Sequence, residues 1–149
     1  MGTLTDSYKI MIVDDSDEDR QRLRQAVEAH PKFTVVAEVC QGDDAVAYLR
    51  GDTIFSERDK YPLPDAILVD SQMPGMTGFD VLQWIRSRSF QDIAVVVRSD
   101  SDLALDESRG LALGADAVQD KSGERDHQKN LLNELENILE HRRRHHPRD

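Results

Sequence analysis

The hydrophobic residues of this chain fall into short runs that alternate with longer segments of mixed polarity. The runs are rich in Val, Ile, Leu and Ala and predict buried strands, whereas the segments between them repeat their apolar residues every three or four positions, as amphipathic helices do. Strands are expected at residues 9–13, 33–40, 66–69, 93–97 and 117–118. Five strand and helix pairs in alternation predict an α/β fold, with a parallel sheet covered by helices on both faces.

The helices have recognisable limits. Helical periodicity covers residues 16–29, 42–49 and 103–113, a segment after the turn at 73–77, and a last segment after Gly123. Residues 51–64 form a charged connection that is longer than the usual ~4 to 6 residues and is expected on the surface. We therefore predict a single domain from 9 to 141, with a flexible tail at 1–8 and a basic tail at 142–149.

Composition and charge exclude several classes of function. A length of 149 residues fits one compact domain. The net charge of -10 would repel a phosphate backbone, so no direct contact with nucleic acid is expected. No apolar run approaches the ~20 residues that span a bilayer, and the first ten residues do not read as a signal peptide, so we expect a cytoplasmic protein without membrane contact. The single cysteine, Cys40, lies in an apolar run and is expected to be buried.

Polar residues stand at the ends of the predicted strands. In an open parallel sheet, ligands bind at the carboxyl ends of the strands. Asp14 and Asp15 follow the first strand, Asp70 follows the third, Ser99 lies near the end of the fourth, and Lys121 follows the fifth. Three carboxylates at one edge repel one another unless a cation relieves them, and oxygen ligands favour a hard ion such as Mg²⁺.

Each of these residues also has an ordinary interpretation when it is taken alone. A strand-end Asp can cap the next helix, Lys121 can be a solvated surface lysine, and Ser99 can be a turn residue. Together, Ser99, Lys121 and a metal ion would offer donors to an anion attached to Asp70, which is a phosphoryl-binding arrangement. No Gly-rich phosphate loop is present, so ATP or NAD binding is not supported.

The segment ILVDSQMPGMTG resembles the response-regulator receiver domains of bacterial two-component signalling. In that family the phosphoacceptor Asp is followed four residues later by Pro and eight residues later by Gly, as Asp70 is by Pro74 and Gly78. The resemblance extends from Lys9 to about Glu140. It implies a doubly wound, flavodoxin-like five-stranded sheet with strand order 2-1-3-4-5.

The resemblance also assigns roles to the strand-end residues. Asp70 is the expected phosphoacceptor and also a Mg²⁺ ligand, together with Asp15 as a direct ligand and Asp14 as a ligand through water. The main-chain oxygen of Gln72 is a further expected ligand. The acidic pair stands in the segment VDD.

Ser99 and Lys121, the latter reached through GADAVQDK, are expected to bind the phosphoryl group. The protein would then be a phosphoacceptor and not an enzyme, beyond slow self-phosphorylation and self-dephosphorylation.

The family also suggests the partners. A histidine kinase or a histidine phosphotransfer protein would supply the phosphoryl group, and a downstream protein target would receive the signal. A homodimer through the face of the fourth and fifth helices is a further expectation. The long connection before LPDAILVD, together with the lack of an output domain in this sequence, looks most like the stand-alone regulators associated with phytochromes and hybrid kinases.

Four residues depart from the family pattern: Arg98, Asp100, Val118 and Ser122. They replace, in that order, an apolar strand residue, a small residue beside the phosphoryl group, an aromatic ring that moves on activation, and a proline after the lysine. These departures leave open an alternative, in which the chain is a pseudo-receiver interaction module that has lost phosphate-dependent switching. A hydrolase of the haloacid-dehalogenase kind is disfavoured because it needs a second acid where Gln72 stands.

Overall fold

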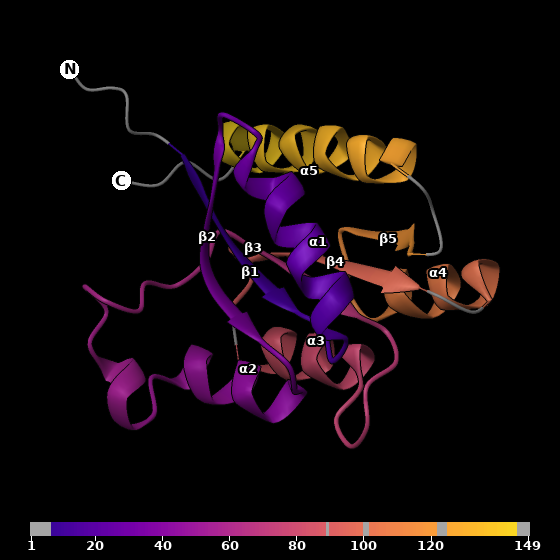
Figure 1. Ribbon diagram of the computed structural model, residues 1–149. Helices are drawn as coiled ribbons and strands as arrows, with labels where there is room; N and C mark the ends of the chain where they lie inside the picture. The colour runs from indigo at the N-terminus through magenta and orange to yellow at the C-terminus, as the bar shows by residue number, and fades with distance from the viewer. Residues whose placement is uncertain (1–6, 89, 100–101, 122–124, 146–149) are drawn as a thin grey trace.

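The computed structural model describes residues 7–88, 90–99, 102–121 and 125–145 of the chain. Its strands form one all-parallel sheet in the order β2-β1-β3-β4-β5, as predicted (Figure 1). The strands are β1 (Tyr8–Val13), β2 (Phe33–Val39), β3 (Ala66–Asp70), β4 (Ala94–Ser99) and β5 (Ala117–Asp120). The three inner strands β1, β3 and β4 are almost wholly buried, which explains their continuous apolar sequences.

Helices cover both faces of the sheet. Figure 1 shows α1 and α5 together on one side and α2 and α3 on the other. The helices are α1 (Asp17–Glu28), α2 (Gly42–Arg50), α3 (Gly78–Ser87), α4 (Leu103–Ala112) and α5 (Arg125–His145), with a short 3-10 helix η2 (Thr53–Ser56). Helix α4 packs against β5. None of the helices in the described residues is long and apolar enough to cross a membrane.

The first strand and the last helix each extend past the segments expected from the sequence. The first strand begins at Tyr8, which pairs with Phe33 on β2. Helix α5 continues to His145 instead of ending at 141, because Arg142 is held in place: its guanidinium donates a hydrogen bond of 3.0 Å to Asp116. The segment from 142 therefore begins as packed helix and not as a free tail.

Cys40 and the connection after α2 differ in how closely they follow the expectations from the apolar pattern. Cys40 is exposed, contrary to expectation, because it follows β2, the edge strand of the sheet, where most side chains are only partly covered. The connection after α2 is well packed, since Arg58 donates to the main-chain oxygens of Tyr48 and Leu49 at the end of that helix.

Candidate functional site

The site lies at the carboxyl edge of the sheet, where the inner strands end. Residues Ile12, Leu68 and Val96 all pack on the α1 and α5 side. Side chains two positions apart point to the same face of a strand, so Asp14, Asp70 and Arg98 follow them on that side. Asp70 stands opposite Arg98 in the register of β3 and β4.

Three carboxylates gather at this edge. Asp14 and Asp70 are 1% and 2% exposed, and Asp15 is exposed to solvent. One oxygen from each of the three lies within 4.8 Å of the others, and Oδ2 of Asp14 is buried without a hydrogen bond of acceptable geometry. A set of oxygen ligands with an unsatisfied carboxylate oxygen fits a hard divalent cation such as Mg²⁺. The structure thus brings together the three acids that the sequence singled out.

Lys121 reaches into this cluster from the end of β5. Its Nζ donates to Oδ2 of Asp70 at 2.9 Å and to Oδ1 of Asp14 at 3.2 Å, and it lies 3.2 Å from Asp19 on the first turn of α1. Burial by itself would lower the pKa of Lys121, but the hydrogen bonds to Asp70 and Asp14 outweigh it and raise that pKa. The lysine is therefore a fixed positive charge between the two buried carboxylates.

The carboxyl group of Asp70 is held in a defined position and is perturbed by its surroundings. Burial raises its pKa to about 6, while Lys121 and the main-chain N–H of Gln72 act in the opposite direction. The Gln72 N–H donates to Oδ1 of Asp70 at 3.1 Å and leaves Oδ2 to the lysine. Above pH 6 the group is therefore a carboxylate with a cation on one oxygen.

Gly78 explains the spacing of the segment that follows Asp70. A Cβ atom at Gly78 would lie 2.2 Å from the main-chain oxygen of Asp70, so no other residue allows helix α3 to start this close to the strand. The helix start is fixed by a capping box, in which Thr77 and Asp80 each bind the other's backbone N–H. The position of Asp70 and the start of α3 are therefore locked together through the backbone.

Ser99 reaches the same edge but binds a partner that the sequence did not indicate. Its hydroxyl donates to Oδ2 of Asp106 on α4 at 2.7 Å, and both side chains are buried. The main-chain oxygen of Ser99 accepts a hydrogen bond from Lys121, which ties the two strand ends together. Asp106 was missed because its helix position resembles that of an ordinary surface residue.

Sequence comparison decides the family. Residues 10–135 match the family model of the response regulator receiver domain, which is most of the chain. The chain belongs to the response-regulator receiver family. This match and the structure confirm the receiver fold and the sheet order 2-1-3-4-5. They also confirm the family that the segment around Asp70 resembles.

Curated relatives of this receiver domain include larger regulators. It is 27% identical over 137 residues to the nitrate/nitrite response regulator protein homolog of Haemophilus influenzae, covering 92% of this chain and 59% of the relative. It is 33% identical over 107 residues to the nitrate/nitrite response regulator NarL of Escherichia coli, covering 72% of this chain and 44% of the relative. The chain thus spans about half the length of these relatives.

Solved structures show the same fold. The phosphorylated cyanobacterial phytochrome response regulator RcpA is similar with a TM-score of 0.76 and 27% identity, over 89% of this chain and 94% of that one. The signal receiver domain of the NarL regulator from Mycobacterium tuberculosis has a TM-score of 0.70 and 25% identity, over 87% of this chain and 96% of that one.

Two of the four departures from the family pattern can be followed in the structure. Arg98 is buried, at 6% exposure, and its Nη1 lies 3.8 Å from Oδ2 of Asp14, so the receiver domain carries a second cation beside the acidic cluster. Val118 faces Gly110 of α4, and a Cβ atom on that glycine would lie 2.7 Å from Val118 Cγ2. The helix sits too close for an aromatic ring to occupy this position unchanged. Asp100 and Ser122 lie outside the described residues.

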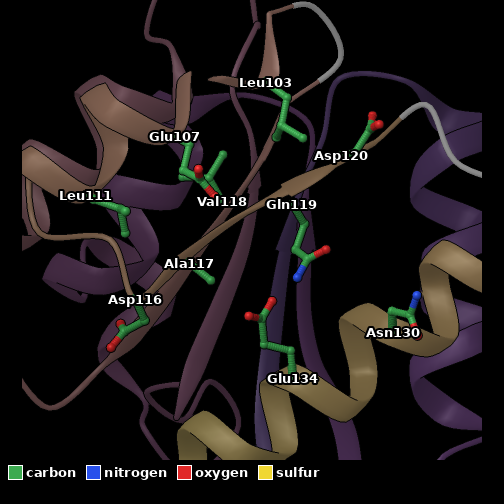
Figure 2. Close-up of a pocket in the computed structure, with 10 residues that line it drawn as sticks. All are labelled: Leu103, Glu107, Leu111, Asp116, Ala117, Val118, Gln119, Asp120, Asn130 and Glu134. Carbon is green, nitrogen blue, oxygen red and sulfur yellow. The ribbon is translucent and has the colours of Figure 1, made fainter. Parts of the chain in front are cut away.

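A groove lies between α4, β5 and α5 of the receiver domain, with a volume of about 530 Å³. Figure 2 shows four carboxylates around it, from Glu107, Asp116, Asp120 and Glu134. Burial, and after it the nearby Glu107, raises the pKa of Glu134. Asp116, by contrast, is paired with Arg86 at 3.1 Å and Arg142 at 3.0 Å. Leu103 and Leu111 of α4 add exposed apolar surface at the edge of the groove.

Proposed function

We propose that this receiver domain accepts a phosphoryl group on Asp70 from a phosphohistidine of a histidine kinase or a histidine phosphotransfer protein. The observation that supports this best is the buried Asp70 carboxylate, which has Lys121 at 2.9 Å and the oxygens of Asp14 and Asp15 within reach of a common cation. A bound Mg²⁺ would be held by these acids with the main-chain oxygen of Gln72, and would supply positive charge to the phosphoryl oxygens.

The reaction needs positioning more than proton transfer. A carboxylate oxygen of Asp70 forms the new bond to phosphorus as the bond from phosphorus to the histidine nitrogen breaks, and the histidine leaves with its electron pair. The Gln72 N–H and Lys121 fix the direction of the carboxylate, and Lys121 remains beside the phosphoryl oxygens to balance their charge. Since Asp70 is ionised above pH 6, no general base is required.

The bond between Ser99 and Asp106 gives the signal a route to α4. A phosphoryl group on Asp70 carries about two negative charges and competes for the Ser99 hydroxyl. If the hydroxyl turns to the phosphoryl group, Asp106 loses its donor while it is buried, which is costly. A shift of α4 that exposes Asp106 to water relieves this cost. Phosphorylation of Asp70 would in this way change the position of α4.

The groove between α4, β5 and α5 is the proposed output surface. It is bordered by the helix that Asp106 would move, and it combines carboxylates with the exposed side chains of Leu103 and Leu111. This chemistry fits a downstream protein segment that carries Lys or Arg beside apolar residues. Glu107 and Glu134 would face their counterparts across a symmetric dimer centred on the groove and repel them, which favours a different protein over a second copy as the partner.

Incubation with acetyl phosphate and MgCl₂, followed by intact mass measurement, tests the proposed chemistry. The expected result is a gain of one phosphoryl mass in the wild type and none in Asp70→Asn. The matched control is Asp43→Asn, which alters an exposed acid at the start of α2 and should be phosphorylated normally.

A folded wild-type protein that gains no phosphoryl mass, and whose Asp70 region does not respond to beryllium fluoride, would overturn this function. It would support the pseudo-receiver interaction module instead. Two observations favour that second candidate: Arg98 already lies beside Asp14, and Ser99 is already bound by Asp106.

A further inference from the structure

Arg98 is a buried cation whose bonding is incomplete. Among the residues that the structure describes, its Nε and Nη1 have no hydrogen-bond partner. Its recorded ion pair within that part of the chain is with Asp14, at 3.8 Å between Nη1 and Oδ2, which is longer than a hydrogen bond. A guanidinium with unsatisfied N–H groups inside a protein is costly, so its retention here calls for a partner that the site can supply.

The Asp14 carboxylate is incompletely bonded on the matching side. Its Oδ1 accepts hydrogen bonds from the Ser16 N–H and from Lys121. Its Oδ2 lies 3.0 Å from Lys121 Nζ but receives no hydrogen bond of acceptable geometry. This oxygen therefore has two cations beside it, Lys121 at 3.0 Å and Arg98 at 3.8 Å, and it belongs to a carboxylate of the acidic cluster that could hold a metal ion.

The strand position keeps Arg98 in this place. It is paired with Asp70 across β3 and β4, and the side chain lies on the same face as those of Asp14 and Asp70. Lys121 forms ion pairs with three acids, Asp70, Asp14 and Asp19. The contact between Lys121 and Asp70 does not involve Arg98, so Arg98 adds a second positive charge to the cluster. A cluster that Lys121 alone would leave strongly negative is thus partly neutralised by the chain itself.

We propose that Arg98 is a tethered counter-ion of Asp14 that competes with the divalent cation and lowers the affinity of the site for Mg²⁺. The inference rests on the proposed function, since it concerns the same metal site. Removal of the guanidinium charge takes away repulsion toward the ion and leaves Oδ2 of Asp14 free to bind the metal or its water. Arg98 is then a positioning residue that acts through Asp14. It raises the Mg²⁺ concentration at which the site fills, and with it the concentration needed for phosphorylation of Asp70.

Mg²⁺ titration by calorimetry at pH 7.5 tests this, with wild type, Arg98→Met and Arg98→Lys. Methionine keeps most of the side-chain length and removes the charge, whereas lysine keeps the charge. The expected result is an affinity about tenfold higher in Arg98→Met and close to that of wild type in Arg98→Lys. A purely structural role would weaken binding in both variants or change it in neither.

A double-mutant cycle with Asp14→Asn identifies the partner. Asp14→Asn lowers the Mg²⁺ affinity by itself, so the quantity to compare is the ratio of the affinities with and without Arg98→Met in each background. If Arg98 acts mainly through Asp14, this ratio is smaller in the Asp14→Asn background, whereas direct repulsion between Arg98 and the ion alone leaves the ratio unchanged and overturns the counter-ion role. Thermal unfolding supplies a second measurement: Arg98→Met should gain more from added Mg²⁺ than wild type does, relative to the same protein in EDTA. This comparison corrects for any loss of stability that the substitution causes in the absence of metal.

The outcomes separate this inference from the function on which it rests. Equal Mg²⁺ affinity in wild type and Arg98→Met, or weaker binding in Arg98→Met, overturns the counter-ion role and leaves phosphorylation of Asp70 standing. Weaker binding of beryllium fluoride in Arg98→Met with unchanged Mg²⁺ affinity would overturn it in favour of direct contact with the phosphoryl group. Failure of both proteins to bind Mg²⁺ at millimolar concentration would overturn the metal site and the counter-ion role together.

Discussion

The two sides of the carboxyl edge of the sheet use their polar side chains in different ways. At the ends of β1 and β3, Asp14 and Asp70 converge on Lys121, and the contacts form one compact cluster. At the end of β4, the neighbouring residues Arg98 and Ser99 point to different partners: Arg98 approaches Asp14 across the sheet, while Ser99 binds Asp106 on α4. The first side, the acceptor side, holds Asp70, the proposed phosphoacceptor, whereas the second connects it to other parts of the molecule.

The backbone supports the two sides to different degrees. Helix α3 approaches strand β3 so closely that a Cβ atom at Gly78 would lie 2.2 Å from the main-chain oxygen of Asp70. Helix α4 also uses a glycine, Gly110, but its contact is with the side chain of Val118. Main-chain contacts cannot adjust without moving a strand, whereas side chains can change rotamer. We infer that the acceptor side is rigid and that the α4 side is the one able to move.

Replacement of these two glycines by alanine gives the largest expected difference. Gly78→Ala would place Cβ 2.2 Å from the main-chain oxygen of Asp70, so we expect a loss of about 4 kcal/mol in the free energy of unfolding. Gly110→Ala should cost only about 1 kcal/mol, because Val118 can shift and alanine favours a helix interior over glycine. Urea denaturation measures both. Equal losses would mean that α4 is held as rigidly as α3.

Lys121→Met should have the next largest effect, because it removes the cation between two buried carboxylates. We expect a loss of about 3 kcal/mol at pH 7.5 without metal, since the stranded charges of Asp14 and Asp70 repel each other. The loss should become smaller at pH 5, where Asp70, whose pKa burial raises to about 6, is protonated, and also in the presence of Mg²⁺. A loss that is independent of both pH and Mg²⁺ would show that the lysine matters for packing alone.

Asp70→Asn is expected to stabilise the domain above pH 7 by roughly 1–2 kcal/mol. The pKa of Asp70 is about 6 in the folded state against 3.8 as its ordinary value, so the folded state binds more protons between these limits. The contribution of Asp70 to stability therefore falls as pH rises from about 4 to 6 and is constant above. The difference in unfolding free energy between Asp70→Asn and wild type should grow as pH rises over this interval. Thermal unfolding at several pH values can measure it. If the stability difference is the same at all pH values, burial of the Asp70 charge is not its cause.

The sequence predicted the acceptor side better than the α4 side, for a physical reason. Asp14, Asp70 and Lys121 stand at the carboxyl ends of three strands, and parallel strands bring these ends to a common edge, so the strand pattern was enough to place them together. Asp106 lies on a helix, and its importance depends on the tertiary contact with Ser99, which no local pattern reveals. The error at Cys40 has a related origin, since an apolar run does not show whether its strand lies at the edge of the sheet.

Asp106→Ala gives the smallest effect and tests the mobile side directly. The substitution removes the hydrogen-bond partner of the Ser99 hydroxyl. The hydroxyl can then turn toward a phosphoryl group without breaking that hydrogen bond, which favours the turn by about 1 kcal/mol. Beryllium fluoride should then bind several-fold more tightly than to wild type, as amide chemical shifts near Asp70 can report. The response of the α4 amides should shrink at the same time, because Asp106 no longer couples the helix to Ser99. Retention of the full α4 response in Asp106→Ala would mean that α4 receives the signal by another path, and the contrast between the two sides would then lose its functional meaning.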